Sequence, residues 1–464
     1  MNSSNLLKLI GIGGAVVILA LLNIESPFIP VGIIALIVIV VFVIRNIRIG
    51  ILILFATKPI IDATYAFQIL PGLSLLQITG VLFPLTVLIY ALQNRPVLHS
   101  PKLMIFFYFF LWINVLSALL TIVHVSTFGS FLFSLVTFFQ VSNMIAVYFL
   151  MPNLISNNDE LKKFLQVLLL AGLFPIITGI LQSFNLLPEL KTLRTTGDLI
   201  RISGWYYDSS NMRFYSFQTL VTSIFFIYHF RPAIILRVSL YVYTAACLFI
   251  TYKTYSKSAI GIIAASFLIY VVLSKRIILG LVGIFIFLTL WTTSDFISRD
   301  IEKLVWKEVK YTESSEGFNT NSLLSGRIGI WDNYLNEYTQ SDIVDKAFGL
   351  SYVVGRNAHN DFLRILVSNG FVGLGLYGVI LLSLLYYLLT SYLSHRDILS
   401  IFSIILFGAF IIDSVGLTMT LQPAYCWFSF GIMSLSINRR TALLGKTLIP
   451  SRMKLDLQTK TSTI

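Results

Sequence analysis

The chain has 464 residues, of which 56% are hydrophobic and only 12% charged, and its mean hydropathy is +0.85. These values lie far outside the range of soluble domains, so they predict an all-α polytopic membrane protein. The formal charge of +12 is better explained by membrane topology than by nucleic-acid binding. Two cysteines in apolar runs and five scattered histidines argue against a disulfide framework or a metal centre, so no metal or other cofactor is expected.

Apolar segments of about 17 to 25 residues are long enough to cross a bilayer. The candidates, in chain order, are 6–22, 28–44, 49–66, 75–92, 103–123, 129–150, 164–183, 213–230, 233–252, 258–274, 277–293, 371–393, 398–415 and 423–437. The third segment, which Lys58, Pro59 and Asp62 interrupt, and the pair around Lys275-Arg276 are the weakest predictions, so 12 to 14 spans are expected. The first segment resembles a signal peptide but lacks a convincing cleavage site, and we expect it to be a retained helix.

Basic residues indicate the orientation, because short cytoplasmic loops collect lysine and arginine. Every second connection is basic, with Arg45, Arg48, Arg95, Lys102, Lys162, Lys163, Arg231, Arg237, Lys275, Arg276 and Arg396. Both termini are therefore expected in the cytoplasm. The opposite side, which faces the periplasm or the cell exterior, receives the polar intervals 184–212 and 294–370 and the short connection 251–257.

This topology divides the chain into six parts. They are N-terminal transmembrane helices at 1–183, a first outer loop at 184–212, central transmembrane helices at 213–293, a large, partly helical outer loop at 294–370, C-terminal transmembrane helices at 371–437 and a basic cytoplasmic tail at 438–464. The large loop thus stands just before the last three spans. ATP-driven chemistry is not expected, because the sequence has no GxxxxGK[ST] phosphate loop and the cytoplasmic connections are short.

Basic residues on the outer side run against the orientation rule and need another explanation. The first outer interval carries Arg201, with Arg213 at its end, among aromatic residues, and Lys257 stands at the start of a later span. A guanidinium group presents a fixed fork to phosphate oxygens, so the arginines are candidate phosphate ligands. The aromatic rings could equally anchor the chain at the membrane interface, and Lys257 could extend along the span to reach the interface.

The end of the second outer interval predicts two helical pieces around a loop. Arg327, Trp331, Tyr334 and Tyr338 are spaced four, three and four, which places them on one helical stripe. After a glycine-containing loop, the sequence Asn357-Ala358-His359-Asn360 leads into positions of a second helical face: Phe362, Leu363 and Leu366. His359 is therefore expected at the start of a short amphipathic helix.

Several polar side chains near His359 suit group transfer. An imidazole with a pKa of about 6.5 can accept a hydroxyl proton at neutral pH. The nearby Arg356 and Arg364, together with Arg327, could hold an anionic leaving group, and Trp331 and Asn360 could contact a glycan. This set suits transfer of a glycan from a lipid pyrophosphate to a sugar hydroxyl. An isolated histidine more often completes a hydrogen-bond network, and that alternative stays open.

Four motifs carry a resemblance to a known family: SGRIGIW at 325–331, AHNDFLRILVSNGFVGL at 358–374, RISGWYYDSSN at 201–211 and YSKSAIG at 255–261. With the layout of spans and loops, they resemble the O-antigen ligase and O-antigen polymerase superfamily of bacterial membrane glycosyltransferases, over roughly residues 180 to 440. In this family proline commonly precedes the asparagine, whereas here Ser210 precedes Asn211, so Arg213 remains an alternative to Arg201.

The resemblance implies a metal-independent, inverting enzyme that uses an undecaprenyl-pyrophosphate-linked oligosaccharide as donor. Arg201 and Arg327 would clamp the pyrophosphate, and His359 would act as base toward the acceptor hydroxyl; Arg356 and Arg364 are alternative clamps. The acceptor would be lipid A-core for a ligase of lipopolysaccharide biosynthesis. For an O-antigen or exopolysaccharide polymerase it would be a lipid-linked repeat, and a chain-length regulator would be a possible partner. The sequence does not distinguish these two.

A transporter or flippase of lipid-linked sugars is the alternative from another class. It predicts polar groups facing a cavity in the middle of the membrane. The available polar residues within spans are Asn114, Gln140, Asn143, Gln166 and Gln218, while ionisable groups well inside spans are nearly absent and Asp413 lies close to an outer end.

Overall fold

The structure is a computed structural model that describes residues 46–64, 68–70, 73–94, 96, 100–124, 127–187, 195–196, 199–294, 298–300, 302–303, 313–314, 317–318, 323–352 and 358–438. The expected spans 6–22 and 28–44, most of the basic tail and most of the interval 294–322 lie outside these residues. Arg356 also lies outside them.

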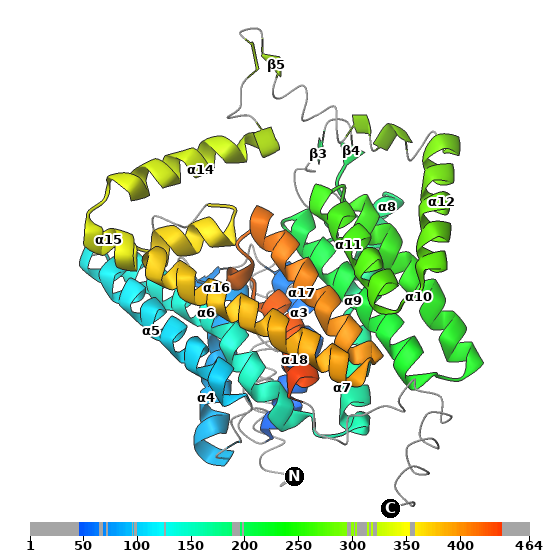
Figure 1. Cartoon of the computed structure of the whole chain (residues 1–464), viewed down its shortest axis with the longest axis horizontal. Coiled ribbons are helices and arrows are strands. Elements are labelled where there is room, and N and C mark those ends of the chain that lie inside the picture. The colour runs from blue at the N-terminus through cyan, green and yellow to red at the C-terminus, as the bar shows by residue number, and fades with distance from the viewer. Residues whose placement is uncertain are drawn as a thin grey trace, which may run out of the picture.

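The described residues form a helical bundle with small hairpins at its edges (Figure 1). The helices are α3 (Ile47–Ala63), α4 (Leu75–Asn94), α5 (Pro101–His124), α6 (Phe128–Leu154), α7 (Asn158–Ala171), α8 (Leu173–Ser183), α9 (Ser209–Phe230), α10 (Ile234–Lys253), α11 (Lys257–Leu273), α12 (Ile277–Thr293), α14 (Leu323–Gln340), α15 (Ile343–Phe348), α16 (Asp361–His395), α17 (Ile398–Gly416), the 3₁₀ helix η3 (Met419–Leu421) and α18 (Pro423–Ile437). The antiparallel pairs are β1 (Gln68–Leu70) with β2 (Leu73–Ser74), β3 (Thr195–Thr196) with β4 (Leu199–Ile200), and β5 (Glu313–Ser314) with β6 (Gly317–Phe318).

Seven helical stretches within the described residues are long and apolar enough to cross a membrane. They include the continuous stretch Asn158–Ser183, which joins α7 and α8, and the 35-residue α16. Every span predicted from residue 49 onward falls on a helix, but α3, α9, α11, α12 and α18 are not among the seven, because α9 is too polar and the other four are shorter than 18 residues. The chain is therefore an all-α membrane protein, as its composition predicts.

Polar residues placed just before the apolar segments explain where several helices begin. The side chains of Asn46, Thr127, Asn157, Asp208 and Asp397 each accept a hydrogen bond from a backbone N–H in the first turn of the following helix. Such caps satisfy donors that have no partner within the helix. The caps therefore help define where each of these helices starts.

Asn143 of α6 shows how the bundle compensates a proline within a span. Pro84 of α4 has no N–H, so the carbonyl of Gly80 lacks its helical donor. The Asn143 side chain donates to that carbonyl at 2.8 Å, and its oxygen accepts from the indole N–H of Trp427 in α18 at 2.6 Å. One amide from the predicted set of intramembrane polar residues therefore joins three helices, and Trp427 also packs its ring on Phe83 with centroids 4.3 Å apart.

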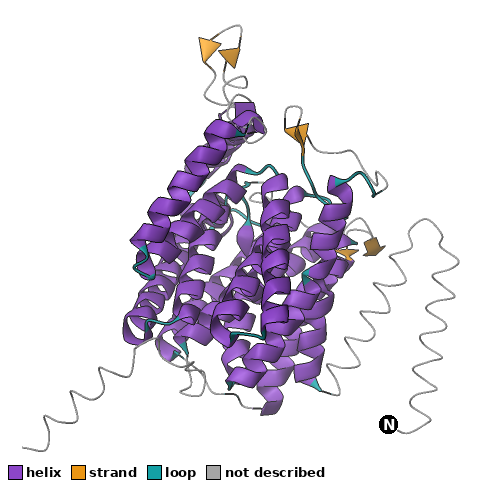
Figure 2. Ribbon diagram, turned by 90° about the vertical axis from the view of Figure 1, so that its right-hand side faces the viewer, coloured by secondary structure: helices purple, strands orange, loops and turns teal. Residues whose placement is uncertain are grey.

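Hydrogen bonds show which helix ends lie together. Tyr215, near the start of α9, bonds to Asp62 near the end of α3, while Arg213 of α9 pairs with Asp413 near the end of α17. We call this end of the bundle the polar end. In Figure 1, α14 and the hairpins β3–β4 and β5–β6 lie beyond it, and Figure 2 shows the helices side by side with strand pairs beyond one end. At the opposite end Arg48 pairs with Glu160.

Candidate functional site

The short connection between α10 and α11 is where the two long polar intervals meet. From the first interval, the Arg201 Nε donates to the carbonyl of Thr254 at 3.0 Å, and the Ile202 N–H donates to the carbonyl of Lys253 at 3.2 Å. Both contacts are made to backbone carbonyls, so they fix the path of the first interval across the polar end. The Arg201 side chain is half-buried there.

The second interval reaches the same connection through Asp300. This buried carboxylate accepts hydrogen bonds from the hydroxyls of Tyr252 at 3.0 Å and Tyr255 at 2.8 Å. Burial and the bond to Asp300 raise the pKa of Tyr255 well above its usual value, so its hydroxyl stays protonated and remains a donor. The two outer intervals, which the expected chemistry needs close together, thus both contact the α10–α11 connection. Lys257, the first residue of α11, directly follows this connection and is exposed.

Arg213 points into the protein interior. Its side chain is only 2% exposed, and its guanidinium donates to the Asp413 carboxylate at 2.5 Å, to the Ser256 hydroxyl at 2.5 Å and to Ser258. An arginine whose charge is neutralised by a buried partner has little left to offer an external phosphate. Of the two arginines that the sequence leaves as alternatives, Arg201 therefore has the better access.

The predicted stripe on α14 is confirmed. Tyr338 is buried and Trp331 is partly buried against Ala358 and Val367, which lie next to and within the first turns of α16. The indole N–H of Trp331 donates to the Ala358 carbonyl at 2.9 Å, and the Tyr338 hydroxyl donates to the Lys346 carbonyl at 2.6 Å. The aromatic face of α14 thus holds that helix against the residue that precedes His359.

Two glycines allow α15 to lie directly against α16. Gly349 and Gly370 have φ of +97° and +67°, and a Cβ on either would collide with backbone, at Ser368 and at Ala347 respectively. The Leu350 N–H donates to the Val367 carbonyl at 2.8 Å across this contact. Gly370 also interrupts the helical geometry of α16. A short helix therefore precedes the span that starts at Phe371, as the sequence predicts, but it is buried on nearly all sides and is not the amphipathic helix that was expected.

His359 lies just outside the start of α16. Its backbone has φ of +49°, a left-handed conformation that is uncommon for residues other than glycine, and its side chain is exposed. Asn360 caps the helix, since its side-chain oxygen accepts from the Leu363 N–H at 3.0 Å. Arg327 is half-buried, with its Nη1 2.8 Å from the point where a Cβ on Gly416 would lie. Arg327 therefore lies over the end of α17.

Arg364 is buried, with 2% of its surface exposed. Its Nε donates to Asp361 at 3.2 Å and its Nη2 to the Thr420 hydroxyl at 2.6 Å. Like Arg213, it is engaged inside the protein. Neither Asp361 nor Thr420 stands out in the sequence, although an acidic residue in the first turn of a helix is a recognisable stabilising feature.

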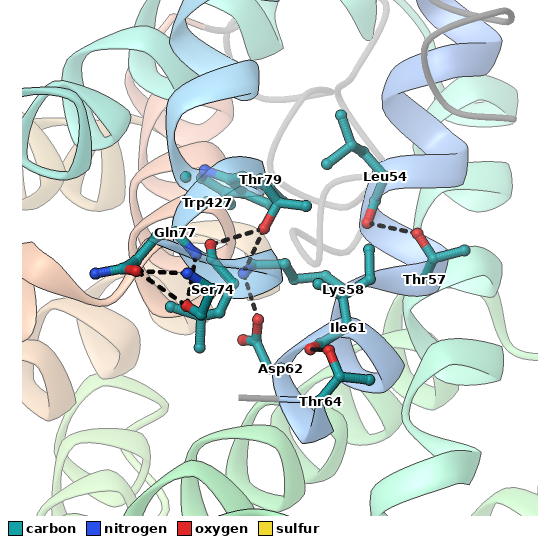
Figure 3. Close-up of polar contacts among 12 residues, drawn as sticks. Leu54, Thr57, Lys58, Ile61, Asp62, Thr64, Ser74, Gln77, Thr79 and Trp427 are labelled. Atoms are coloured by element: carbon teal, nitrogen blue, oxygen red, sulfur yellow. Dashed lines mark hydrogen bonds and ion pairs between the residues drawn. The ribbon is translucent and has the colours of Figure 1, made fainter. Parts of the chain in front are cut away.

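Lys58 and Asp62 are the charged residues that the sequence interpretation treated only as an interruption of a span. The Lys58 ammonium pairs with Asp62, donates to the Thr79 hydroxyl at 3.2 Å and lies 5.4 Å from the ring centroid of Trp427 (Figure 3). Asp62 also accepts from the Tyr215 hydroxyl at 2.6 Å. A lysine and an aspartate four residues apart in an apolar helix was the available signal, because such residues within a membrane must find partners.

A small cavity adjoins this pair between α3, α9 and α18. Its wall includes Lys58, Tyr215, Gln218 and Trp427, and it has about 30 Å³ of space for water. The Gln218 side chain is buried, and its Nε2 has no hydrogen-bond partner among the described residues. A cavity of this size holds one or two water molecules.

Within the described residues, no group of three or more histidine, cysteine, aspartate or glutamate side chains is placed to bind a metal ion. Comparison of the sequence with protein-family models and with curated proteins finds no match.

Proposed function

We propose that this protein is a membrane glycosyltransferase that moves an undecaprenyl-pyrophosphate-linked oligosaccharide onto an acceptor hydroxyl during assembly of a bacterial surface polysaccharide. His359 takes the acceptor proton as general base while Arg327 stabilises the pyrophosphate leaving group. The acceptor attacks the anomeric carbon, the bond from that carbon to the pyrophosphate oxygen breaks, and the configuration inverts. The acceptor is lipid A-core if the protein is an O-antigen ligase, or a lipid-linked repeat if it is a polymerase.

The observation that carries this proposal is the hydrogen bond from Trp331 to the Ala358 carbonyl at 2.9 Å. Trp331 lies one helical turn from Arg327 on α14, and Ala358 directly precedes His359. Residues four apart lie on the same helix face at about 5–6 Å between Cβ atoms. One tryptophan thus holds the helix of the candidate clamp against the turn of the candidate base, and the four motifs that resemble the O-antigen ligase and polymerase superfamily support the same residues.

Burial divides the other candidate residues by role. Arg201 and Lys257 stand on either side of the α10–α11 connection with surface exposed, so we assign them to the pyrophosphate or the first sugars. Arg213 and Arg364 pair with buried carboxylates inside the bundle, so we assign them a structural role. The side-chain oxygen of Asn360 accepts the helix-cap hydrogen bond, and the indole N–H of Trp331 donates to Ala358. A glycan would therefore contact the amide nitrogen of Asn360 and the ring face of Trp331.

The charge pattern supports the membrane orientation that this chemistry needs. Lysine and arginine gather in the connections opposite the polar end, so we place that opposite end in the cytoplasm and the polar end in the periplasm or at the cell exterior. The protein would then lie in the bacterial inner membrane and meet its donor after the donor has been flipped outward.

A complementation experiment tests the proposal. A deletion strain receives wild-type protein, His359→Ala or Arg327→Ala, and membrane abundance and surface polysaccharide are compared. Loss of polymer at normal protein abundance supports the transferase. Accumulated unligated chains then indicate a ligase, and single repeats indicate a polymerase. A complete polymer ladder from both variants contradicts the proposed site.

Transport of lipid-linked sugars is a second candidate, favoured by the charged Lys58 beside a cavity inside the bundle. Asp62 neutralises that lysine, and the cavity accepts water rather than a sugar. A flippase predicts that Lys58→Met, compared with wild type at equal membrane abundance of folded protein, stops delivery of lipid-linked repeats to the periplasm. A transferase predicts that delivery continues and that unused donor accumulates on the outer leaflet when His359 is replaced.

A further inference from the structure

The contact between η3 and the first turn of α16 is unusually polar for the interior of a membrane protein. Asp361, the first residue of α16, is completely buried. One carboxylate oxygen accepts from the Thr420 N–H at 2.8 Å. The other accepts from the Thr420 hydroxyl at 2.6 Å and from the Arg364 Nε at 3.2 Å. The Arg364 Nη2 closes the set by donating to the Thr420 oxygen at 2.6 Å.

This cluster contributes geometry more than stability. Burying a carboxylate and a guanidinium costs about as much as their pairing returns, so an apolar contact would hold the two elements together at least as well. Hydrogen bonds differ from apolar contacts because they fix distance and angle. Asp361, Arg364 and Thr420 therefore hold η3 and α16 in one relative position.

The relative position of η3 and α16 bears on the two candidate reacting groups, His359 and Arg327. His359 lies two residues before Asp361. Asn360, between them, caps α16 with its side chain and so leaves little freedom for the intervening backbone. Thr420 lies four residues after Gly416, against which the Arg327 guanidinium lies. The cluster is thus a buried link between the turn that carries His359 and the connection that follows the end of α17 under Arg327.

We propose that Asp361, Arg364 and Thr420 form a buried clamp that fixes His359 relative to the end of α17, and so relative to Arg327. The clamp residues are positioning residues. Their catalytic consequence rests on the proposed transferase function, whereas the fixed position of His359 is a property of the structure alone.

Two variants of one residue separate the clamp hydroxyl from its surroundings. Thr420→Val keeps the shape and removes the hydroxyl, while Thr420→Ser keeps the hydroxyl. Thr418→Val makes the same chemical change two residues away, at a half-buried threonine outside the clamp, and serves as the matched control. If Thr420→Val does not yield folded protein, Asp361→Asn replaces it, because the amide keeps the shape and weakens the acceptor.

The first measurement is the distance between spin labels on full-length protein in detergent or nanodiscs. His359→Cys and Val415→Cys place labels on exposed positions across the clamp, and both native cysteines are buried. We expect a narrow distance distribution in the wild-type background, with Thr420→Ser and with Thr418→Val, and a broadened or shifted one with Thr420→Val. An unchanged distribution in Thr420→Val overturns the clamp.

The second measurement is steady-state transfer by unlabelled variants that retain His359. We expect Thr420→Val to lower kcat by about 10- to 100-fold, since a misplacement of about 1 Å has effects of this size, with KM for the lipid-linked donor within about twofold. Thr420→Ser should retain wild-type kcat. A broadened label distance with unchanged kcat overturns the positioning role. If wild-type protein shows no transfer, the proposed function fails, while the label distances still decide whether the clamp fixes His359.

Discussion

Two sets of charged residues lie at the polar end of this protein, and they differ in burial. The first set consists of buried ion pairs: Lys58 with Asp62, Arg213 with Asp413, and Arg364 with Asp361. The second set has surface exposed and comprises Arg201, Lys257, Arg327 and His359. A buried charge requires a partner from the same protein, whereas a side chain that keeps exposed surface can also contact a substrate. Arginine alone therefore does not identify a candidate substrate ligand in this protein, and we use burial to choose among the arginines.

Breaking one buried pair tests the first half of this comparison most strongly. Asp413→Leu leaves Arg213 buried without its carboxylate, and we expect it to lower the free energy of unfolding by about 3–5 kcal/mol. The double variant Arg213→Met, Asp413→Leu removes both charges and should recover most of that loss. Thermal unfolding of purified protein in detergent measures both. If Asp413→Leu were as stable as wild type, the Arg213–Asp413 pair would not stabilise the fold as we describe.

Gly370→Ala tests the close contact between α15 and α16 on which the position of α14 depends. The new Cβ would meet the Ala347 backbone at a residue with φ of +67°, and we expect destabilisation of about 1–3 kcal/mol or more. Gly375→Ala, in the same helix, is the matched control, because a Cβ there meets nothing within 4 Å. This variant should stabilise the protein by about 0.5–1 kcal/mol. Equal unfolding temperatures for the two variants would remove the steric argument.

Tyr215→Phe removes only the hydroxyl that donates to Asp62 across α3 and α9. We expect a loss of about 1–3 kcal/mol in the free energy of unfolding, since the acceptor is a buried carboxylate. Tyr241→Phe, at an exposed tyrosine of α10, should be neutral in the same chemical denaturation series. If both tyrosine variants unfold at the wild-type denaturant concentration, the Asp62 network does not contribute as the contacts indicate.

Trp331→Phe weakens the link between the two regions with the smallest effect on folding. Phenylalanine keeps the aromatic packing but cannot donate to Ala358, so we expect a loss of about 1 kcal/mol of stability. Transfer activity should fall by a larger factor than stability accounts for, because α14 is then less firmly held beside His359. Activity that follows the folded fraction one for one would confine Trp331 to packing.

The sequence predicts the spans well because each one is a local signal. Apolar length marks the helices, Gly370 and Phe371 mark the break in α16, and the aromatic spacing marks the face of α14. The ion pair that joins α9 to α17 is not predictable from local patterns, because its two members are distant in the chain. Arg213 and Asp413 are 200 residues apart, and no periodicity connects them.

The candidate site remains a prediction, and the sequence suggests only part of it. His359 and Arg327 belong to one stretch of sequence, so two short helices and a loop suffice to propose them together. Thr420 lies 59 residues from Asp361 on a connection with no charge of its own, and nothing local shows that it closes a buried cluster. Lys58 and Asp62 are recognisable in the sequence as an i, i+4 pair. In an apolar segment, however, two charged residues indicate a weak span rather than a buried hydrogen-bond network.

The most direct test of the account measures transfer and unfolding on the same preparations of wild type, His359→Ala and Arg327→Ala, reconstituted with a lipid-pyrophosphate-linked glycan and an acceptor. We predict that transfer falls by at least about 100-fold in both variants while the unfolding temperature stays at the wild-type value, because these side chains serve chemistry rather than the frame. Full transfer by either variant, or unfolding as severe as that of Asp413→Leu, would contradict the proposed division between reacting side chains that keep exposed surface and buried, structural ion pairs.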